Sequence, residues 1–258
     1  MPFAQSFDGN RIYYEIKGNG QPIIFLPCVG ARLEYWKFQE PLADKYKLIF
    51  VDTAGVGKSE SNRKEFTYPS LASDVIAVIE KEQVVNPIIV GHSFGGVIAL
   101  EIAAQLKEKI QGIVCVDSLM PLTAYYAKKA TAEEMEEEMK NYEGNYQEYY
   151  DGLVYRMLTD NLDEETKQWV LSVAGYRQID TAILRDMVRQ MLLHDYHEVL
   201  PKVTCKIKYI IRRYNPEYLD VIIKEQKNAR IMDNVGHLMN IENPVIFNKI
   251  LDELVSEL

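Results

Sequence analysis

Residues 87–97 read Pro-Ile-Ile-Val-Gly-His-Ser-Phe-Gly-Gly-Val, and this stretch is the strongest indication of the fold. A β-branched apolar run enters the Gly-X-Ser-X-Gly pentapeptide Gly91–Gly95, and an apolar, helix-like stretch leaves it. This pattern predicts a strand, a tight turn with Ser93 at its apex, and a helix, because flanking glycines let the chain reverse sharply. The turn would hold the Ser93 hydroxyl above a helix N-terminus, where negative charge is favoured. Ser93 is therefore the candidate nucleophile.

Strand and helix patterns alternate on both sides of this turn. Asp8–Asn10 is a turn signal that predicts a hairpin over residues 3–17. Because strands that alternate with helices form parallel sheets, we expect an α/β fold with a mainly parallel sheet and helices on both faces. The expected strands are 23–26, 48–51, 88–90, 113–116, 207–211 and 230–232, and the expected helices are 34–44, one opened by Pro69, one reaching Leu106, 216–226 and one from Pro244.

Residues 119–195 break this alternation. They are acidic, helix-prone and rich in tyrosine, with eight tyrosines at 125, 126, 142, 146, 149, 150, 155 and 176. We interpret 119–195 as a helical cap (lid) subdomain inserted into a core formed by residues 1–118 and 196–258. Its tyrosines either line an aromatic pocket or pack the cap onto the core.

Composition limits the functions that need to be considered. The net charge is −9, and residues 118–199 hold 16 Asp and Glu against 8 Lys and Arg, which is −8 of that total. This balance argues against nucleic acid as a partner. No apolar stretch is long enough to span a membrane, and the N-terminus does not resemble a signal peptide. Cys28, Cys115 and Cys205 are odd in number and scattered, so we expect reduced thiols, a cytoplasmic location and no metal site.

Four motifs resemble those of the α/β-hydrolase fold family. The segment Asp52–Ser59 is similar to the family's D-x-x-G-x-G-x-S loop, and Gly91–Gly96 to its nucleophile elbow. Gly236-His237 with Glu242-Asn243-Pro244 is similar to the stretch that holds the catalytic histidine, and the chain from His194 resembles the return from the cap into strand 7. The resemblance implies an eight-stranded sheet and a serine hydrolase, but this fold hosts many chemistries.

A serine nucleophile needs a base and an acid. His237 is the candidate base, because His92 would point away from the Ser93 side chain and His194 and His197 sit where the cap ends. Many family members place an Asp after strand 7, but Ile211–Glu217 has none there. Asp117, at the end of the strand beside the nucleophile strand, is the favoured acid. Glu217, Asp220 and the absence of an acid are the alternatives.

The oxyanion hole should consist of two backbone N–H groups. The resemblance implies Phe94, directly after the nucleophile, and Val29, from the loop after strand 3. The family usually has His-Gly where this chain has Pro27-Cys28. We interpret Cys28 as a small core residue rather than a second nucleophile.

The expected function is a carboxylesterase-like serine hydrolase that cleaves a small, uncharged, fairly apolar ester through an acyl-enzyme. We expect a small-molecule substrate, no cofactor, no metal, no nucleic acid and no membrane partner, and a homodimer is left open. Two alternatives also remain open. The same residues would serve a C–C bond hydrolase or a thioesterase, and the fold could serve a ligand-binding or signalling protein with little turnover.

Overall fold

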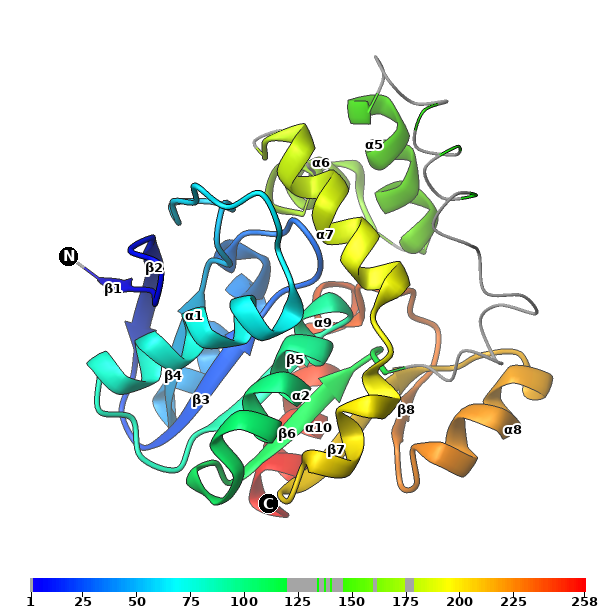
Figure 1. The fold of residues 1–258 in the computed structure, drawn as a ribbon. Coiled ribbons are helices and arrows are strands. Elements are labelled where there is room, and N and C mark those ends of the chain that lie inside the picture. The colour runs from blue at the N-terminus through cyan, green and yellow to red at the C-terminus, as the bar shows by residue number, and fades with distance from the viewer. Residues whose placement is uncertain are drawn as a thin grey trace.

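The computed structural model confirms an α/β fold built on an eight-stranded, mainly parallel sheet (Figure 1). The structure describes residues 2–119, 134, 137, 140, 146–159, 162–174 and 179–258, without the side chains of 146–150, 153 and 192. The strands are β1 (Phe3–Gln5), β2 (Arg11–Lys17), β3 (Gln21–Leu26), β4 (Tyr46–Val51), β5 (Ile88–His92), β6 (Gly112–Val116), β7 (Lys206–Arg212) and β8 (Arg230–Met232).

The strand order is β1-β2-β4-β3-β5-β6-β7-β8. β1 pairs with β2 and β2 pairs with β4, both antiparallel. The pairings of β3 with β4 and from β3 through β5, β6 and β7 to β8 are parallel. All residues of β5 and β6 are buried, as expected for central strands covered on both faces. In the register of this pair, His92 lies opposite Val116, so Ser93 and Asp117 leave neighbouring strands at the same edge.

Helices cover both faces of the sheet. In Figure 1, α1 and α2 pack side by side on one face, whereas η1, α9 and α10 contact one another on the other. The helices are η1 (Leu33–Asp44), α1 (Tyr68–Lys81), α2 (Phe94–Leu106), η2 (Lys107–Lys109), α5 (Tyr146–Met157), α6 (Glu164–Val173), α7 (Thr181–Leu193), η4 (Tyr196–Glu198), η5 (Leu200–Lys202), α8 (Pro216–Glu225), α9 (Met239–Glu242) and α10 (Pro244–Ser256).

Local sequence explains where several of these helices begin. The Thr67 side chain accepts the Ser70 N–H at the start of α1, and the Asn243 side chain accepts the Ile246 N–H at the start of α10. The segment expected as a helix over 34–44 is instead a run of 3₁₀ turns over Leu33–Asp44. Pro41 lies inside it and has no N–H to donate to an α-helical ladder.

Helices α5, α6 and α7 are grouped beyond the carboxyl ends of the central strands (Figure 1). Hydrogen bonds tie α6 and α7 to loops of that edge. The Arg32 N–H donates to the Val173 carbonyl (2.9 Å), and the Phe66 N–H donates to the Asp186 carboxylate (2.6 Å). The described residues within 119–195 contain no strand, and the division into core and cap stays a prediction.

Most of the expected tyrosine pattern of 119–195 cannot be compared with the structure. Of the eight tyrosines, Tyr155 alone has a described side chain, and the other seven side chains lie outside the described part of the chain. Tyr155 is exposed, and its hydroxyl donates to Glu164 at 3.1 Å. Glu134 and Glu137 are exposed as well, as expected for a solvated acidic face.

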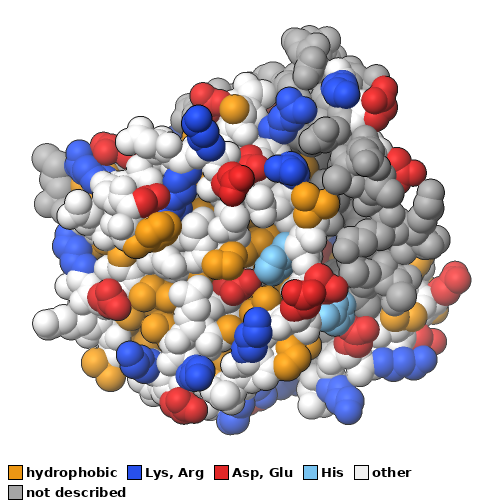
Figure 2. All heavy atoms as spheres, in the orientation of Figure 1, with side chains coloured by type: hydrophobic (Ala, Val, Ile, Leu, Met, Phe, Trp, Pro, Cys, Tyr) orange, Lys and Arg blue, Asp and Glu red, His pale blue; other side chains and the backbone are white. Residues whose placement is uncertain are grey.

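The described part of the face shown in Figure 2 has no large charged patch. On the face shown in Figure 2, Lys and Arg side chains are interspersed with Asp and Glu over the described part of the molecule. In the described ranges no helix has the length and apolar character that crossing a bilayer requires. The cytoplasmic location stays a prediction.

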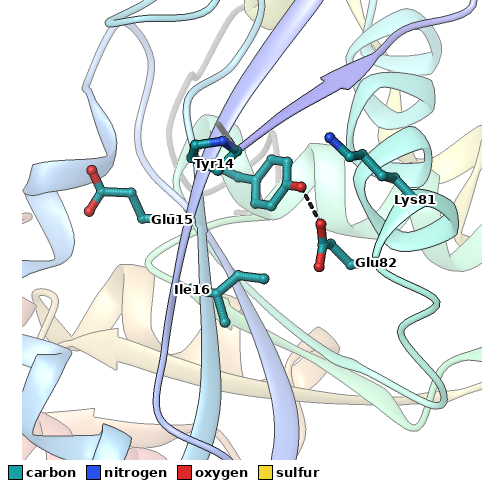
Figure 3. Close-up of a pocket in the computed structure, with 6 residues that line it drawn as sticks. Tyr14, Glu15, Ile16, Lys81 and Glu82 are labelled. Carbon is teal, nitrogen blue, oxygen red and sulfur yellow. Dashed lines mark hydrogen bonds between the residues drawn. The ribbon is translucent and has the colours of Figure 1, made fainter.

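One surface hollow lies at the antiparallel edge of the sheet, between β2 and the end of α1 (Figure 3). The Tyr14 hydroxyl donates to the Glu82 carboxylate across it, and burial together with this carboxylate raises the pKa of Tyr14. None of the predicted site residues lines this hollow, so the candidate site lies elsewhere. The lining residues are Pro2, Tyr14, Glu15, Ile16, Lys81 and Glu82.

Candidate active site

Ser93 occupies the sharp turn between β5 and α2. Its backbone has φ 52° and ψ −114°, a conformation that residues other than glycine rarely adopt. The Ser93 N–H donates to the Val116 carbonyl (2.9 Å), and the Ser118 hydroxyl donates to the Ser93 carbonyl (2.5 Å). These bonds from the β6 end hold Ser93 in its strained conformation. Strain of this kind is often found at functional sites.

The glycines around Ser93 are required by close backbone contacts. A Cβ atom on Gly91 would lie 2.2 Å from the Gly95 carbonyl oxygen. A Cβ atom on Gly95 would lie 2.4 Å from the Leu26 carbonyl oxygen and 2.6 Å from that of Pro27. The turn therefore packs directly against the end of β3 and the loop that carries Val29.

The structure brings His237 and Asp117 together. The His237 Nδ1 atom lies 2.6 Å from the Asp117 Oδ2 atom, and the side chains are 12% and 0% exposed. If Nδ1 carries the ring proton it donates to the carboxylate, which leaves Nε2 as an acceptor. This is the arrangement that a general base needs.

The alternative acids lie elsewhere. Glu217 and Asp220 are on α8, and both are exposed. Among the described residues, no hydrogen bond or ion pair joins either carboxylate to His237. Asn215 lies after β7, where many family members have the acid. It is exposed and directly precedes α8.

The His237 ring lies beside the strand that carries Ser93. The ring centroids of His237 and His92 are 4.5 Å apart, and His92 is the last residue of β5 before Ser93. The fold thus places the predicted base beside the residue that precedes the predicted nucleophile, although 144 positions separate Ser93 and His237 in the sequence. The catalytic roles of Ser93, His237 and Asp117 stay predictions.

The loop that carries His237 is fixed by groups around it. The backbone N–H of His237 donates to the carbonyl of Met157, the last residue of α5, at 2.9 Å. The Glu242 carboxylate accepts the Gly236 N–H (3.0 Å) and both the N–H (3.3 Å) and the hydroxyl of Thr159. Glu242 therefore joins the histidine loop to the segment after α5. Sequence reasoning matched Glu242 to a family motif but did not find this contact.

His92 has structural partners that the sequence did not reveal. It is fully buried, its Nδ1 atom lies 2.8 Å from the Tyr35 hydroxyl, and that hydroxyl also contacts Asn240 Oδ1 at 2.8 Å. Burial lowers the pKa of His92 well below its ordinary value of 6.5, so the ring is neutral. In the sequence, a histidine at the end of an otherwise apolar strand is the feature that could have indicated such a buried network.

The predicted donors of the oxyanion hole are the N–H groups of Val29 and Phe94. Phe94 opens α2 directly after Ser93, and Val29 lies in the loop against which Gly95 packs. In the hydrogen bonds found between described residues, neither N–H acts as a donor. Both are thus available to bind a developing negative charge, and their assignment stays a prediction.

Cys28 and the two remaining histidines have other surroundings. Burial raises the pKa of Cys28 to about 12, so its thiol is protonated near neutral pH and is a poor nucleophile. His194 lies 3.3 Å from Glu101, and His197 lies 2.9 Å from Asp195. Within the described ranges, no group of three or more His, Cys, Asp or Glu could hold a metal ion.

The family model for the alpha/beta hydrolase fold matches residues 21–171. This chain belongs to that family. An uncharacterized hydrolase of Bacillus subtilis, YugF, is 37% identical over 117 residues, which are 43% of this chain and 42% of that protein. The chain spans between 30% and 44% of the length of three curated relatives that it matches at 30–37% identity.

Two further similarities cover nearly the whole chain. The Karrikin insensitive 2 receptor CA of Petunia hybrida is 24% identical, over 92% of this chain and 93% of the receptor. Among solved structures, the esterase EaEST of Exiguobacterium antarcticum superposes with a TM-score of 0.83 at 21% identity, covering 99% of both chains. At that identity, the esterase structure supports the fold alone.

Proposed function

We propose that this protein is a serine hydrolase that cleaves a small, uncharged, fairly apolar carboxylic ester through an acyl-enzyme. The observation that carries this proposal is the buried Asp117–His237 contact of 2.6 Å, next to a serine on a strained turn. A serine, a histidine and a carboxylate in this arrangement suit acyl transfer. Membership of the alpha/beta hydrolase fold family agrees with that chemistry.

In the proposed reaction, His237 Nε2 takes the proton of the Ser93 hydroxyl as Ser93 attacks the ester carbonyl. The N–H groups of Val29 and Phe94 bind the oxyanion of the tetrahedral intermediate. The alcohol then leaves with the proton from His237, and Ser93 is acylated. His237 then takes a proton from water as the water attacks the acyl carbonyl; the bond to Ser93 breaks, the carboxylic acid leaves, and His237 returns the proton to the Ser93 oxygen.

Residues 119–195 would form the cap over this site, and their charge bears on the substrate. The segment 118–199 has twice as many acidic as basic side chains, which disfavours an anionic ester. Because most of the acidic side chains that are described in this region are exposed, salt would screen much of this repulsion.

A fluorophosphonate probe and p-nitrophenyl acetate and butyrate test the proposal. The wild-type protein should cleave both esters and gain one phosphonyl adduct at Ser93 by mass spectrometry. Ser93→Ala should lose both properties, and Ser256→Ala, a change at an exposed serine at the end of α10, should keep them. Ester cleavage that survives in Ser93→Ala would overturn the mechanism. A panel with thioesters and C–C bond substrates distinguishes the alternative hydrolases.

A second candidate is a ligand-binding or signalling protein with little turnover. The observation that favours it is the similarity to the Petunia receptor over 92% of this chain. Under this hypothesis the wild-type protein would bind a small molecule but would not cleave the ester substrates. Calorimetry beside the turnover assay separates the two candidates.

A further inference from the structure

Asp117 has two further partners: Arg212, the last residue of β7, and Tyr214, which follows two residues later. The Tyr214 hydroxyl donates to Asp117 Oδ1 at 2.8 Å, and Arg212 Nε lies 3.3 Å from Asp117 Oδ2. The Arg212 guanidinium lies over the Tyr214 ring, 4.7 Å from its centroid. The two side chains therefore support each other while each contacts one carboxylate oxygen.

These contacts matter because Asp117 is removed from solvent. Its side chain is 0% exposed, and a buried carboxylate is costly unless charged or hydrogen-bonding groups surround it. His237 contacts Oδ2 alone, so it can satisfy only part of the carboxylate. Tyr214 satisfies the other oxygen, and Arg212 places a positive charge beside the one that faces His237.

The backbone of Asp117 also depends on β7. Asp117 has φ 40°, in the left-handed region, and its N–H donates to the Ile210 carbonyl at 2.8 Å. β7 runs parallel to β6 with Ile210 opposite Val116, so the residues after Ile210 emerge beside Asp117. Strand β7, which lies beside β6 (Figure 1), thus supplies the backbone acceptor and the Arg212 side chain, and the segment directly after β7 supplies Tyr214.

We propose that Arg212 and Tyr214 are positioning residues that orient the Asp117 carboxylate toward His237 and stabilise its negative charge. This inference rests on the proposed function, in which Asp117 supports the imidazolium that His237 becomes. Tyr214 selects the rotation of the carboxylate by binding Oδ1. Arg212 stabilises the charge on Oδ2 and, by stacking on Tyr214, holds that hydroxyl in place.

Four single variants separate positioning from a general effect on the fold. Arg212→Gln and Tyr214→Phe should lower kcat for p-nitrophenyl butyrate about tenfold to one-hundredfold, with KM little changed. Losses of this size follow when a side chain that orients a functional group is removed. Arg212→Lys keeps the charge and should restore most of kcat. The matched control is Arg213→Gln, which removes an exposed arginine paired with Asp233 and should change kcat less than about twofold.

A double-mutant comparison tests whether the effect acts through Asp117. In the Asp117→Asn background, Arg212→Gln should cause little further loss, because the carboxylate that it serves is gone. A loss of the same size in both backgrounds would overturn the proposal. So would equal rates for Arg212→Gln and Arg213→Gln. If Arg212→Gln fails to fold, the kcat values of Tyr214→Phe and Arg212→Lys relative to wild type test the same proposal.

A spectroscopic readout keeps this inference distinct from the proposed function. The proton between His237 and Asp117 in the wild-type protein should give a far-downfield proton NMR signal, whether or not the protein turns over an ester. Arg212→Gln should shift or broaden that signal, and Arg213→Gln should not. Wild-type protein that shows the signal but neither cleaves esters nor reacts with the probe would contradict the proposed function alone. An unchanged signal in Arg212→Gln would contradict the positioning role.

Discussion

The Nδ1 atom of His237 lies 2.6 Å from the Oδ2 atom of Asp117, across 120 positions of sequence. Replacing Asp117 by Asn would place an amide beside the ring, and the ring would no longer have a negative charge to stabilise its protonated form. We expect Asp117→Asn to lower kcat for p-nitrophenyl butyrate by about 10⁴-fold, as the equivalent change does in a serine triad. Steady-state kinetics measures the loss.

The matched control for Asp117→Asn is Glu217→Gln, which changes an exposed carboxylate on α8. Its kcat should stay within about twofold of the wild-type value, because a surface charge at that place does not touch the site. The reverse result, with a large loss only in Glu217→Gln, would move the acid to the segment after β7.

Gly95 packs against the loop that carries the predicted oxyanion donor Val29. An alanine there would put a Cβ atom 2.4 Å from the Leu26 carbonyl oxygen, so the loop must move. We expect Gly95→Ala to destabilise the protein by about 2 kcal/mol, as overpacking does, and to lower kcat. Urea unfolding and ester kinetics measure the two effects.

Gly152, inside α5, is the control for Gly95. A Cβ atom on Gly152 would meet nothing within 4 Å. Since alanine is a better helix former than glycine, Gly152→Ala should stabilise α5 by up to about 1 kcal/mol and leave kcat unchanged. If both alanine variants behaved alike, close packing at Gly95 would not explain its effect.

The fold was predictable because its signals are local. The apolar runs of β3, β5 and β6, the glycines around Ser93 and the capping residues of α1 and α10 act over a few positions. The motif order also indicated which residues of distant segments meet, since parallel strands end at one edge of the sheet. The resemblance to family motifs thus predicts Ser93 and His237 and favours Asp117 as the acid, and the structure gives the contact between His237 and Asp117.

The remaining features depend on tertiary contacts that no local pattern encodes. The contacts of Arg212 and Tyr214 with Asp117 follow from the register of β6 and β7, which periodicity does not specify. The link from Glu242 to Thr159 crosses 83 positions and depends on where α5 ends. Both are consequences of the fold rather than causes of it. The 3₁₀ character of η1, in contrast, has a local signal, because Pro41 lies inside the segment.

Glu242 joins the histidine loop to the segment after α5. Its carboxylate accepts the Gly236 N–H and two donors of Thr159. In Glu242→Gln, an amide donor would face these N–H and hydroxyl donors, which would leave at least one of them unpaired. We expect a loss of stability of about 1–3 kcal/mol and a lower kcat, because the position of His237 depends on this loop.

Unfolding in urea and ester kinetics test the Glu242 prediction. Glu253→Gln, at an exposed position on α10, should change neither quantity. Thr159→Val removes only the hydroxyl donor and should give a smaller loss than Glu242→Gln. An unchanged kcat in Glu242→Gln would mean that the contact with the Met157 carbonyl alone holds the loop.

Asp8 should make stability depend on pH. Its hydrogen bonds to Arg63, which is only 7% exposed, lower the pKa of Asp8 from 3.8 to about 2. Because the pKa of the folded state lies below that of the unfolded chain, the contribution of Asp8 is fully present above about pH 4. It is lost as the pH falls through about 2. Solvent screening at this partly exposed pair limits it to about 1 kcal/mol.

We therefore expect Asp8→Asn to lower the free energy of unfolding by about 1 kcal/mol near pH 7 and by progressively less below about pH 4. Urea unfolding followed by tryptophan fluorescence at several pH values measures the difference from wild type. Asp220→Asn, which removes an exposed carboxylate on α8, should show no such change with pH. A difference for Asp8→Asn that persisted undiminished near pH 2 would mean that Asp8 stabilises the hairpin of β1 and β2 by packing and neutral hydrogen bonds, since about half of its charge would then be gone.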